Sequence, residues 1–271
     1  GVHDILLDGE GRVYLAGRWD SIGGKTHANL VRLKSDLTLD DDFATVLGAG
    51  PDGLVRDASP DTDGGILIGG SFTRVSNLPG TTSFARILEN GGIDRTLVSL
   101  ASTGDTYRIA RAPGSDKIYI AGSIASYLSG RYVFRLNADG TRDYAFNPNN
   151  LAGTVRDFMI RPDDALVVGG AFTAAPPYLT ALLPSGVNDT SFVPSAAANN
   201  AVNSIAIQPN GKFVIGGAFT TFGGTANRFA RVTADGKVDT TLNLGTGFSG
   251  EVLKVATAAD GRIWVGGNFS Q

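Results

Sequence analysis

The sequence has no cysteine, one methionine and two histidines among its 271 residues. Without cysteine there is no disulfide framework, no thiolate metal site and no cysteine nucleophile, and the redox compartment cannot be read from the chain. With only His3 and His27, an imidazole-based catalytic triad or a multi-histidine zinc site is nearly excluded. These absences remove several common classes of enzyme.

Charge and long apolar runs are also scarce. Charged residues make up 18% of the chain and the formal net charge is −3, which argues against the basic footprint of a nucleic-acid binder or an anionic-membrane binder. There is no apolar run of about 18 residues and no signal-peptide pattern. We therefore expect neither nucleic-acid binding nor membrane insertion. The chain begins at Gly1 without methionine, and we interpret it as a segment of a longer precursor or a matured product.

Glycine, in contrast, is abundant, at 37 residues, and 42% of the chain is hydrophobic. This composition predicts many turns, few long helices and a substantial core. A pair of small residues recurs inside an apolar run, and its second members are 53, 52, 48, 47 and 50 residues apart. The six pairs are Ala16-Gly17, Gly69-Gly70, Ala121-Gly122, Gly169-Gly170, Gly216-Gly217 and Gly266-Gly267. Near-constant spacing of this kind indicates an internal repeat.

The repeating unit is clearest in the fifth copy. Residues 202–208 alternate apolar and polar, 209–211 (PNG) form a turn, and 212–220 (KFVIGGAFT) are a second apolar run, which together predict a β-hairpin. After a loop, residues 228–243 predict a second hairpin with an Ala-Asp-Gly turn. No segment has a helical period long enough for a helix, so each unit is predicted to be four short antiparallel strands.

The count is five full units and a sixth that stops after its first hairpin. The predicted repeats cover approximately 1–53, 54–106, 107–154, 155–201, 202–251 and 252–271. Repeats of this length and content predict an all-β fold, a β-propeller of four-stranded antiparallel blades forming a single domain over 1–271. An open β-solenoid is the alternative. Five blades with an accessory hairpin, six blades with one incomplete, and part of a larger ring all remain open.

Residues 205–250, which include QPNGK, IGGAFT and RVTADGKVDTTL, resemble the delta-60 repeat, a bacterial β-propeller repeat. Residues 137–148, NADGTRDYAFNP, are similar to the last part of that repeat. The resemblance covers essentially the whole chain and is strongest from 131 to 251. It implies a β-propeller and a secreted or cell-surface bacterial protein, and it implies no agreed activity.

An arginine is followed eight residues later by an aspartate in four of the second hairpins. With a three-residue turn between them, the two residues lie opposite each other, so we predict structural cross-strand ion pairs rather than a catalytic ring. The pairs are Arg32 with Asp40, Arg86 with Asp94, Arg135 with Asp143 and Arg231 with Asp239. In the fourth unit Ala181 replaces the arginine while Asp189 remains, which marks a carboxylate without its repeat partner.

Acidic turns raise the possibility of calcium, which takes six to eight oxygen ligands. The nearest candidate is Asp61 with Asp63, although neither it nor any other turn completes the D-x-D-x-D-G pattern. We therefore expect no cofactor and keep calcium at Asp61 and Asp63 as a weak candidate against ordinary Asx turns.

The loops between hairpins do not repeat, and variable loops on a rigid scaffold are where recognition is common. The periodic phenylalanines at 72, 172, 219 and 269 are predicted to be core. Hydrophobic anchoring of each loop aromatic is the alternative to ligand contact. The candidate ligand-binding residues are Trp19, His27, Tyr127, Tyr178 and Phe222.

From these observations we expect a noncatalytic binding or adhesion module, with a polysaccharide or a protein partner at a loop face. A carbohydrate-active enzyme, hydrolase or lyase, with its site at one propeller mouth is the first alternative, and a structural spacer is the second. The resemblance, rather than any targeting signal in the segment, implies an extracellular or cell-surface location.

Overall fold

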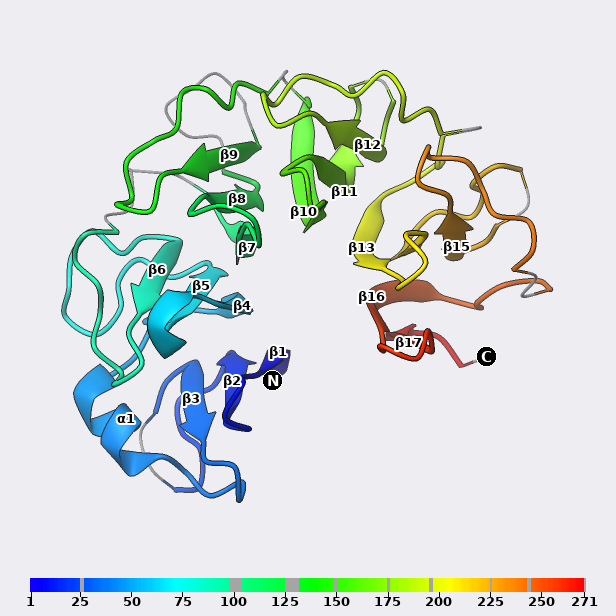
Figure 1. Ribbon diagram of the computed structural model, residues 1–271. Helices are drawn as coiled ribbons and strands as arrows, with labels where there is room; N and C mark the ends of the chain where they lie inside the picture. The colour runs from blue at the N-terminus through cyan, green and yellow to red at the C-terminus, as the bar shows by residue number, and fades with distance from the viewer. Residues whose placement is uncertain are drawn as a thin grey trace. The chain divides into compact units, whose positions relative to one another are not determined.

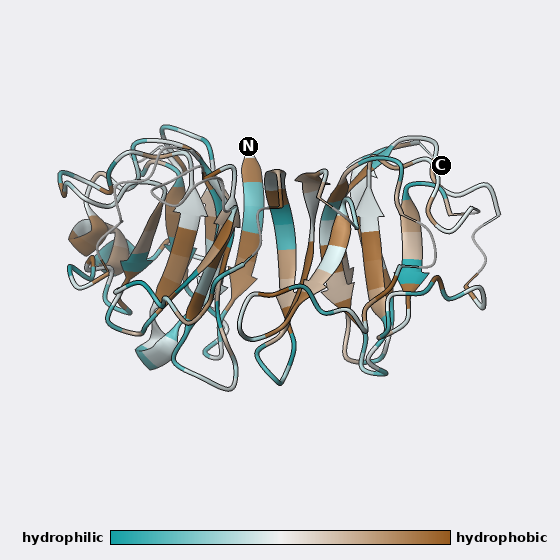
Figure 2. Cartoon of the chain, turned by 90° about the horizontal axis from the view of Figure 1, so that it is seen from above, coloured by the Kyte–Doolittle hydropathy of each residue, from teal (hydrophilic) through white to brown (hydrophobic). Residues whose placement is uncertain are grey.

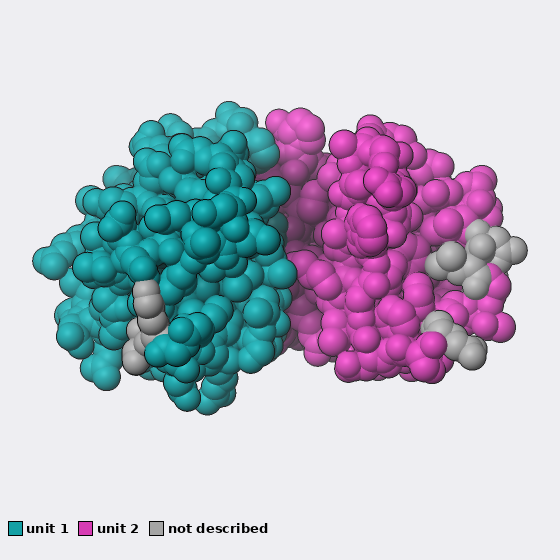
Figure 3. Space-filling view, turned by 90° about the horizontal axis from the view of Figure 1, so that it is seen from below, with its two compact units in different colours: residues 1–129, 133–144 teal, residues 130–132, 145–271 magenta. Residues whose placement is uncertain are grey.

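The chain folds as an all-β propeller built from consecutive antiparallel sheets (Figure 1). The computed structural model describes residues 1–24, 27–97, 104–124, 132–148, 151–174, 176–194, 197–224, 226–242 and 245–270. The chain divides into two compact units, residues 1–129 with 133–144 and residues 130–132 with 145–271 (Figure 3). Each unit is considered by itself, and the single-domain organisation stays a prediction.

Unit 1 contains three sheets, here called blades 1 to 3. Their strands are β1 (Val2–Leu7), β2 (Val13–Gly17) and β3 (Leu30–Leu33); β4 (Val55–Pro60), β5 (Ile66–Gly70) and β6 (Phe84–Ile87); and β7 (Thr106–Arg111), β8 (Ile118–Gly122) and β9 (Val133–Leu136). The helix α1 (Asp41–Leu47) follows blade 1, and the 3-10 turn η1 (Thr62–Gly64) joins β4 to β5.

Unit 2 contains blades 4 to 6. Their strands are β10 (Gly153–Ile160), β11 (Leu166–Phe172) and β12 (Leu179–Leu182); β13 (Val202–Ile207), β14 (Phe213–Gly217) and β15 (Phe229–Val232); and β16 (Glu251–Thr257) and β17 (Ile263–Asn268). Within each unit the first strands of neighbouring blades pack together, β1 on β4 on β7 and β10 on β13 on β16. We therefore call the first strand of each blade its inner strand.

Apolar residues lie mainly along the strands, and polar residues lie mainly in the connections (Figure 2). The predicted core phenylalanines Phe72, Phe172 and Phe219 are fully buried, because each lies two residues past a small pair in a central strand. Phe269, the equivalent residue in blade 6, is only partly buried.

In blades 1 to 5 the predicted fourth strand is reduced to a single bridge. The bridges join Leu33 to Leu39, Ile87 to Ile93, Leu136 to Arg142, Leu182 to Asn188 and Val232 to Val238. One residue later the aspartate side chain bonds the backbone instead of continuing the ladder: Asp94 Oδ1 accepts the Thr96 N–H at 2.8 Å, and Asp239 Oδ1 accepts the Thr241 N–H at 3.0 Å. This Asx geometry turns the chain away from the sheet.

The expectation that no helix forms is wrong at α1. Asp40 caps this seven-residue helix by accepting the Phe43 N–H, and Gly48 ends it with a positive φ of 74°. Two acidic residues in the first turn favour the helix N-terminus. Two turns are too short for a helical period to show in the sequence.

The small pairs allow two different close approaches. A Cβ on Gly216 would lie 2.3 Å from Val252 Cγ1 in the next blade, whereas a Cβ on Gly217 would lie 2.2 Å from the carbonyl of Ala201 in its own blade. Gly169 and Gly170 are placed in the same way against Val202 and Thr154. The first glycine therefore admits the neighbouring blade, and the second admits the adjacent strand.

Candidate functional site

Each inner strand carries a β-bulge at the same point, which leaves one residue outside the ladder. The register shifts fall between Val2 and Asp4, Val55 and Asp57, Thr106 and Arg108, Val155 and Asp157, Val202 and Ser204, and Val252 and Lys254. Bulges commonly re-aim a side chain at a functional position. We call the six extra residues the bulge row: His3, Arg56, Tyr107, Arg156, Asn203 and Leu253.

In blades 1, 2, 4 and 5 the residue after the bulge accepts a backbone N–H of the next blade. Asp57 Oδ2 accepts the Ile109 N–H at 2.9 Å, and its Oδ1 lies 2.7 Å from Arg108 Nη1. The same joint recurs in both units: Asp4 accepts the Ala58 N–H, Asp157 accepts the Ile205 N–H, and the Ser204 hydroxyl accepts the Val255 N–H. These interactions satisfy backbone donors at the bulges and connect neighbouring inner strands.

In unit 1 the bulge row makes contacts from blade to blade. The Arg56 guanidinium lies 4.6 Å from the centre of the Tyr107 ring, and its Nη2 donates to Asp105 Oδ2 at 3.0 Å. Burial lowers the pKa of His3, and the positive charges of Arg56 and of the N-terminal amine lower it further. His3 is exposed, and Arg56 and Tyr107 are half-buried.

In unit 2 the row forms a hydrogen-bonded chain. Arg156 Nη1 donates to the Asn203 side-chain oxygen, and Asn203 Nδ2 donates to Glu251 Oε1 at 2.9 Å and to the Val252 carbonyl at 2.8 Å. Arg156 and Glu251 are about one third exposed. A repeated backbone feature thus presents five residue types in six blades: histidine, tyrosine, asparagine and leucine once each, and arginine in blades 2 and 4.

Sequence reasoning missed this row. The signal is the pattern V-x-D or V-x-S at 2–4, 55–57, 155–157 and 202–204, in which the outer positions recur and the middle one changes. Variable positions are expected in loops rather than in strands, and one extra residue within a strand looks like ordinary alternation of apolar and polar residues.

The Arg/Asp pairs are ion pairs across the outer bridge. Nitrogen to oxygen distances are 2.8 Å for Arg32 with Asp40, 2.7 Å for Arg86 with Asp94, 2.8 Å for Arg135 with Asp143 and 2.7 Å for Arg231 with Asp239. The arginines of blades 1 and 2 also reach the next blade, where Arg32 donates to the Glu89 carbonyl and Arg86 to the Ala138 carbonyl. This arrangement stabilises the scaffold.

Asp189 is not left without a cation by Ala181. Arg161 begins the turn between β10 and β11, and its Nη1 lies 3.4 Å from Asp189 Oδ2. Its Nη2 donates to the Ala234 carbonyl in blade 5 at 3.1 Å. A hydrogen bond from Ser191, against the effect of burial and with help from Arg161, lowers the Asp189 pKa. In blade 4 the cation that pairs with the aspartate therefore comes from the β10–β11 turn and not from the third strand.

The predicted loop residues do not come together as one site. Phe222, predicted to contact a ligand, is instead a core residue. Its side chain is fully buried, with its ring 6.0 Å from that of Phe219, because the Gly223-Gly224 turn folds it onto the core. Tyr178 is half-buried and packs against the same core. Trp19 and His27 are half-buried, and Trp19 Nε1 and His27 Nε2 have no hydrogen-bond partner among the described residues. Tyr127 lies outside the described residues.

The carboxylate of Asp61 is fully buried between two guanidinium groups, those of Arg86 and Arg111. Asp63 lies in the exposed turn η1. A calcium ion at Asp61 would therefore compete with two arginines. In the described part of the chain no group of three or more histidine, aspartate or glutamate side chains is placed to hold a metal. Calcium stays a prediction.

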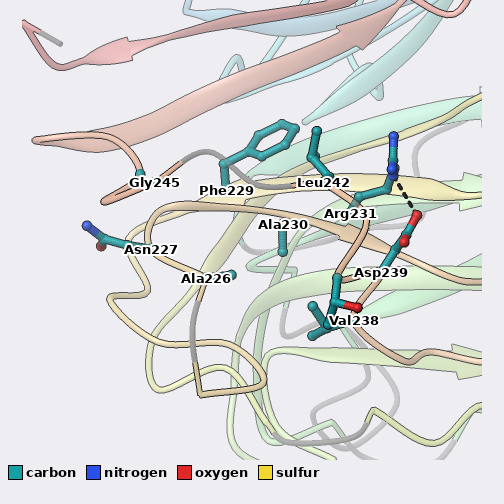
Figure 4. A pocket seen from close by; sticks show the side chains of 11 residues that line it. Ala226, Asn227, Phe229, Ala230, Arg231, Val238, Asp239, Leu242 and Gly245 are labelled. Atoms are coloured by element: carbon teal, nitrogen blue, oxygen red, sulfur yellow. Dashed lines mark hydrogen bonds and ion pairs between the residues drawn. The ribbon is translucent and has the colours of Figure 1, made fainter.

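One cavity, of about 290 Å³, lies on blade 5 (Figure 4). Arg231 and Asp239 form its ion-paired side, and Phe229, Val238 and Leu242 give it an apolar lining. None of the described helices has the length and hydropathy needed to cross a membrane.

The chain is similar in sequence and structure to β-propellers. Residues 11–43, 115–146 and 208–242 match the family described as "Domain of unknown function (DUF5122) beta-propeller". These segments contain parts of repeats 1, 3 and 5. No curated protein matches the sequence.

Three solved structures give the structural comparison. The WD40 β-propeller domain of Doa1 has a TM-score of 0.62 at 14% identity, covering 96% of this chain and 73% of that one. A structural genomics protein from Bacteroides thetaiotaomicron VPI-5482 has a TM-score of 0.54 at 13% identity, covering 96% and 65%. The extracellular domain of the putative hybrid two component system BT4673 from B. thetaiotaomicron has a TM-score of 0.56 at 13% identity, covering 99% and 37%. At these identities the similarity identifies the fold: this chain is a β-propeller with repeats similar to DUF5122.

Proposed function

We propose that the chain is a noncatalytic binding module and that the part of the bulge row in unit 1, which contains Arg56 and Tyr107, binds a protein partner through a short segment of that partner. One observation carries the proposal: a backbone position that recurs in every blade holds five residue types, of which only arginine occurs twice. A purely structural position would repeat its residue, as the aspartates at the blade joints do in blades 1, 2 and 4. Variation on a fixed geometry is typical of recognition.

The chemistry of the row suits a peptide. Arg56 and Tyr107 form a half-buried cation–π pair, and in unit 2 Arg156 and Asn203 present polar side chains. Arginine and tyrosine are enriched where protein interfaces have their strongest contacts. In unit 1, stacking on a peptide side chain uses the Tyr107 ring, and hydrogen bonds to the peptide backbone use the Arg56 guanidinium.

A carbohydrate-active enzyme receives less support. Such enzymes usually need one carboxylic acid whose pKa is raised so that it can donate a proton. Among the described aspartates with a shifted pKa, including Asp94, Asp189 and Asp239, hydrogen bonds to the ionised form lower the pKa. These groups stay ionised and act as acceptors.

We also propose that the repeats belong to the delta-60 type and that the protein is secreted or displayed at a bacterial cell surface. The turn and strand motifs of repeats 3 and 5 support the first statement. The similar extracellular domain of BT4673 supports the second. A polysaccharide is the competing ligand, which the experiment separates from a protein.

The test compares the chain with its Arg56→Ala/Tyr107→Ala variant against a displayed random peptide library and a glycan array. We expect selected peptides to bind the parent chain and to lose at least about tenfold in affinity for the variant, equivalent to about 1.4 kcal/mol. Tyr144→Ala is the matched control, because Tyr144 is a 76% exposed tyrosine of the same unit outside the row. Glycan binding that the double variant abolishes, with no peptide selected, would replace the protein partner with a sugar.

A further inference from the structure

The dipeptide Asn-Gly occurs twice in the chain, as Asn90-Gly91 and as Asn210-Gly211. The first lies in the turn that follows β6 of blade 2, and the second lies in the turn between β13 and β14 of blade 5. Because glycine has no Cβ, its backbone nitrogen is less hindered than that of any other residue. This nitrogen can attack the side-chain amide of the preceding asparagine, so both dipeptides are candidate sites of deamidation.

The two turns have the same internal hydrogen bonds. In each turn the asparagine Oδ1 accepts the N–H two residues further on, that of Gly92 at 2.9 Å and that of Lys212 at 3.1 Å. Gly91 and Gly211 both have a positive φ, of 93° and 79°. Each of them donates its N–H at 2.9 Å to the carbonyl three residues earlier. A difference in reactivity must therefore come from what surrounds the turns.

The surroundings of the two glycines differ. A Cβ on Gly91 would lie 2.4 Å from the carbonyl oxygen of Phe43 in α1, whereas a Cβ on Gly211 would meet nothing within 4 Å. The equivalent glycine of blade 1, Gly11, would contact only Ser35 of its own blade, at 3.5 Å, although a complete blade 2 follows it. The space around Gly211 is therefore a property of this kind of turn and does not depend on blade 6.

Deamidation begins when a base removes the proton from the Gly211 N–H. The nitrogen then forms a bond to the Asn210 side-chain carbonyl carbon and closes a five-membered succinimide ring, while the bond to the side-chain nitrogen breaks and ammonia leaves. Water opens the ring at either carbonyl, which gives aspartate or isoaspartate. The sum is one water consumed and one ammonia released, without an oxidant or a reductant.

Ring closure needs the asparagine and the glycine backbone to rotate into the geometry of attack, because an intramolecular reaction is fast only when its groups are aligned. At Gly211 the open surroundings permit this rotation. At Gly91 the rotation would push the chain against the Phe43 backbone, in packing that leaves no spare volume.

An aspartate at position 210 fits the turn. Asp163 and Asp260 occupy the equivalent position in blades 4 and 6, and each accepts the N–H two residues further on, as Asn210 does. Isoaspartate, in contrast, adds one backbone carbon to a hairpin turn whose length sets the register of its strands. The aspartate product therefore keeps the fold of the turn and adds a negative charge to it.

The added charge would lie near a lysine that already has a partner. In blade 6 the carboxylate of Asp260 lies 2.7 Å from the guanidinium of Arg262, two residues further on. Lys212 has the same spacing from position 210, and its ammonium lies 2.7 Å from Asp239 Oδ2. A new carboxylate at position 210 is thus placed to take this ammonium from Asp239.

We propose that Asn210 is a site of spontaneous deamidation, that the backbone of α1 protects Asn90 from the same reaction, and that the carboxylate formed at position 210 competes with Asp239 for Lys212. The proposal goes beyond recognition at the bulge row and involves none of its residues.

The first test follows both asparagines in the parent chain during incubation in mildly alkaline buffer, with peptide mapping by mass spectrometry and isoaspartate detection. In the native state Asn210 should convert at least about tenfold faster than Asn90, the equivalent of about 1.4 kcal/mol in activation free energy. In urea the two rates should converge, because unfolding removes the contact with Phe43. No conversion of Asn210 in the native chain, a native ratio near one, or the same ratio in urea would each overturn the proposal.

The second test uses Asn210→Asp as the defined product and Asn90→Asp as the matched control, which adds the same charge in blade 2. Titration of the Asp239 carboxyl group by NMR should give a higher pKa in Asn210→Asp and an unchanged pKa in the control, because the hydrogen bond from Lys212 is the largest cause of the low Asp239 pKa. In a Lys212→Met background the added carboxylate should no longer raise this pKa. An unchanged Asp239 pKa in Asn210→Asp, or a rise that persists without Lys212, would overturn the competition for the lysine.

Discussion

At the scale of single residues, the constant element of the outer hairpin is the carboxylate rather than the arginine. Asp189 keeps its ion pair through Arg161 after Ala181 has replaced the strand arginine. Asp143 and Asp239 each have a lysine as a second cation, Lys117 at 2.9 Å and Lys212 at 2.7 Å. The aspartate does two tasks, since it also accepts the backbone N–H that ends the outer strand, as Asp239 does from Thr241.

Removing the substitute cation should destabilise blade 4. Arg161→Ala should lower the free energy of unfolding by about 1–3 kcal/mol, because Asp189 is a largely buried carboxylate that would lose its cation. The double variant Arg161→Ala/Ala181→Arg should recover most of this loss, since it returns the arginine to the position that pairs with the aspartate in blade 5. Urea denaturation of the three proteins measures both effects. A double variant no more stable than Arg161→Ala would contradict the equivalence of the two arginines.

Acid should weaken the hairpins together. Hydrogen bonds from Lys212 and Thr241 hold the Asp239 pKa well below its usual range, and for Asp94 the bonds from Thr96 and Arg86 outweigh the opposing effect of burial on the pKa. Because the folded-state pKa values are depressed, this stability is fully present above about pH 4 and is lost as the pH falls further.

Urea midpoints at pH 7, 5, 3 and 2 test this expectation. The midpoint should change little between pH 7 and 5 and should fall between pH 4 and 2. An Asp239→Asn variant should show a smaller acid-induced loss than the parent, because it has already lost the ionised acceptor. A parent chain that gains stability on acidification would contradict the sign of the pKa shifts.

At the scale of elements, the recurring phrases of the sequence predicted the strands and their turns because they encode packing that is the same in every blade. The all-β propeller and the first hairpins are therefore confirmed. The outer strand was overestimated, because the aspartate that appears to continue it instead ends it through an Asx turn. The pairing of Arg161 with Asp189 could not be predicted, because Ala181 gives no sign of which cation replaces the strand arginine. The bulge row was missed although the recurring V-x-D and V-x-S patterns mark it.

The small pair gives a matched comparison within one protein. Gly216→Ala should lower the free energy of unfolding by about 1–3 kcal/mol, because the added methyl would lie 2.3 Å from Val252 Cγ1. Gly266→Ala, at the equivalent position of blade 6, meets no atom within 4 Å and should not destabilise. Thermal melting of both variants measures the difference. Equal losses would show that the glycine is needed for its backbone and not for the space it leaves.

At the scale of the whole chain, repetition separates two tasks. The residues that recur, such as Asp57 and Asp157, join blade to blade within each unit. The residues that change from blade to blade, such as Tyr107 and Asn203, occupy a bulge in the inner strand that recurs in every blade. The sequence alone placed the variable residues in loops, where Phe222 proved to be core. The structure moves the candidate site to the inner strands.

This separation is tested most directly by chemical denaturation of two matched sets of alanine variants, Asp57 and Asp157 against Arg56 and Arg156. Each set takes one residue from each unit, and the members lie one position apart in the chain. The account predicts a loss of about 1–3 kcal/mol for each aspartate, which leaves a buried N–H without its acceptor, and at most about 1 kcal/mol for each arginine, whose ion pair is partly exposed. Losses that are equal, or larger for the arginines, would show that the bulge row is part of the scaffold and would contradict its role in recognition.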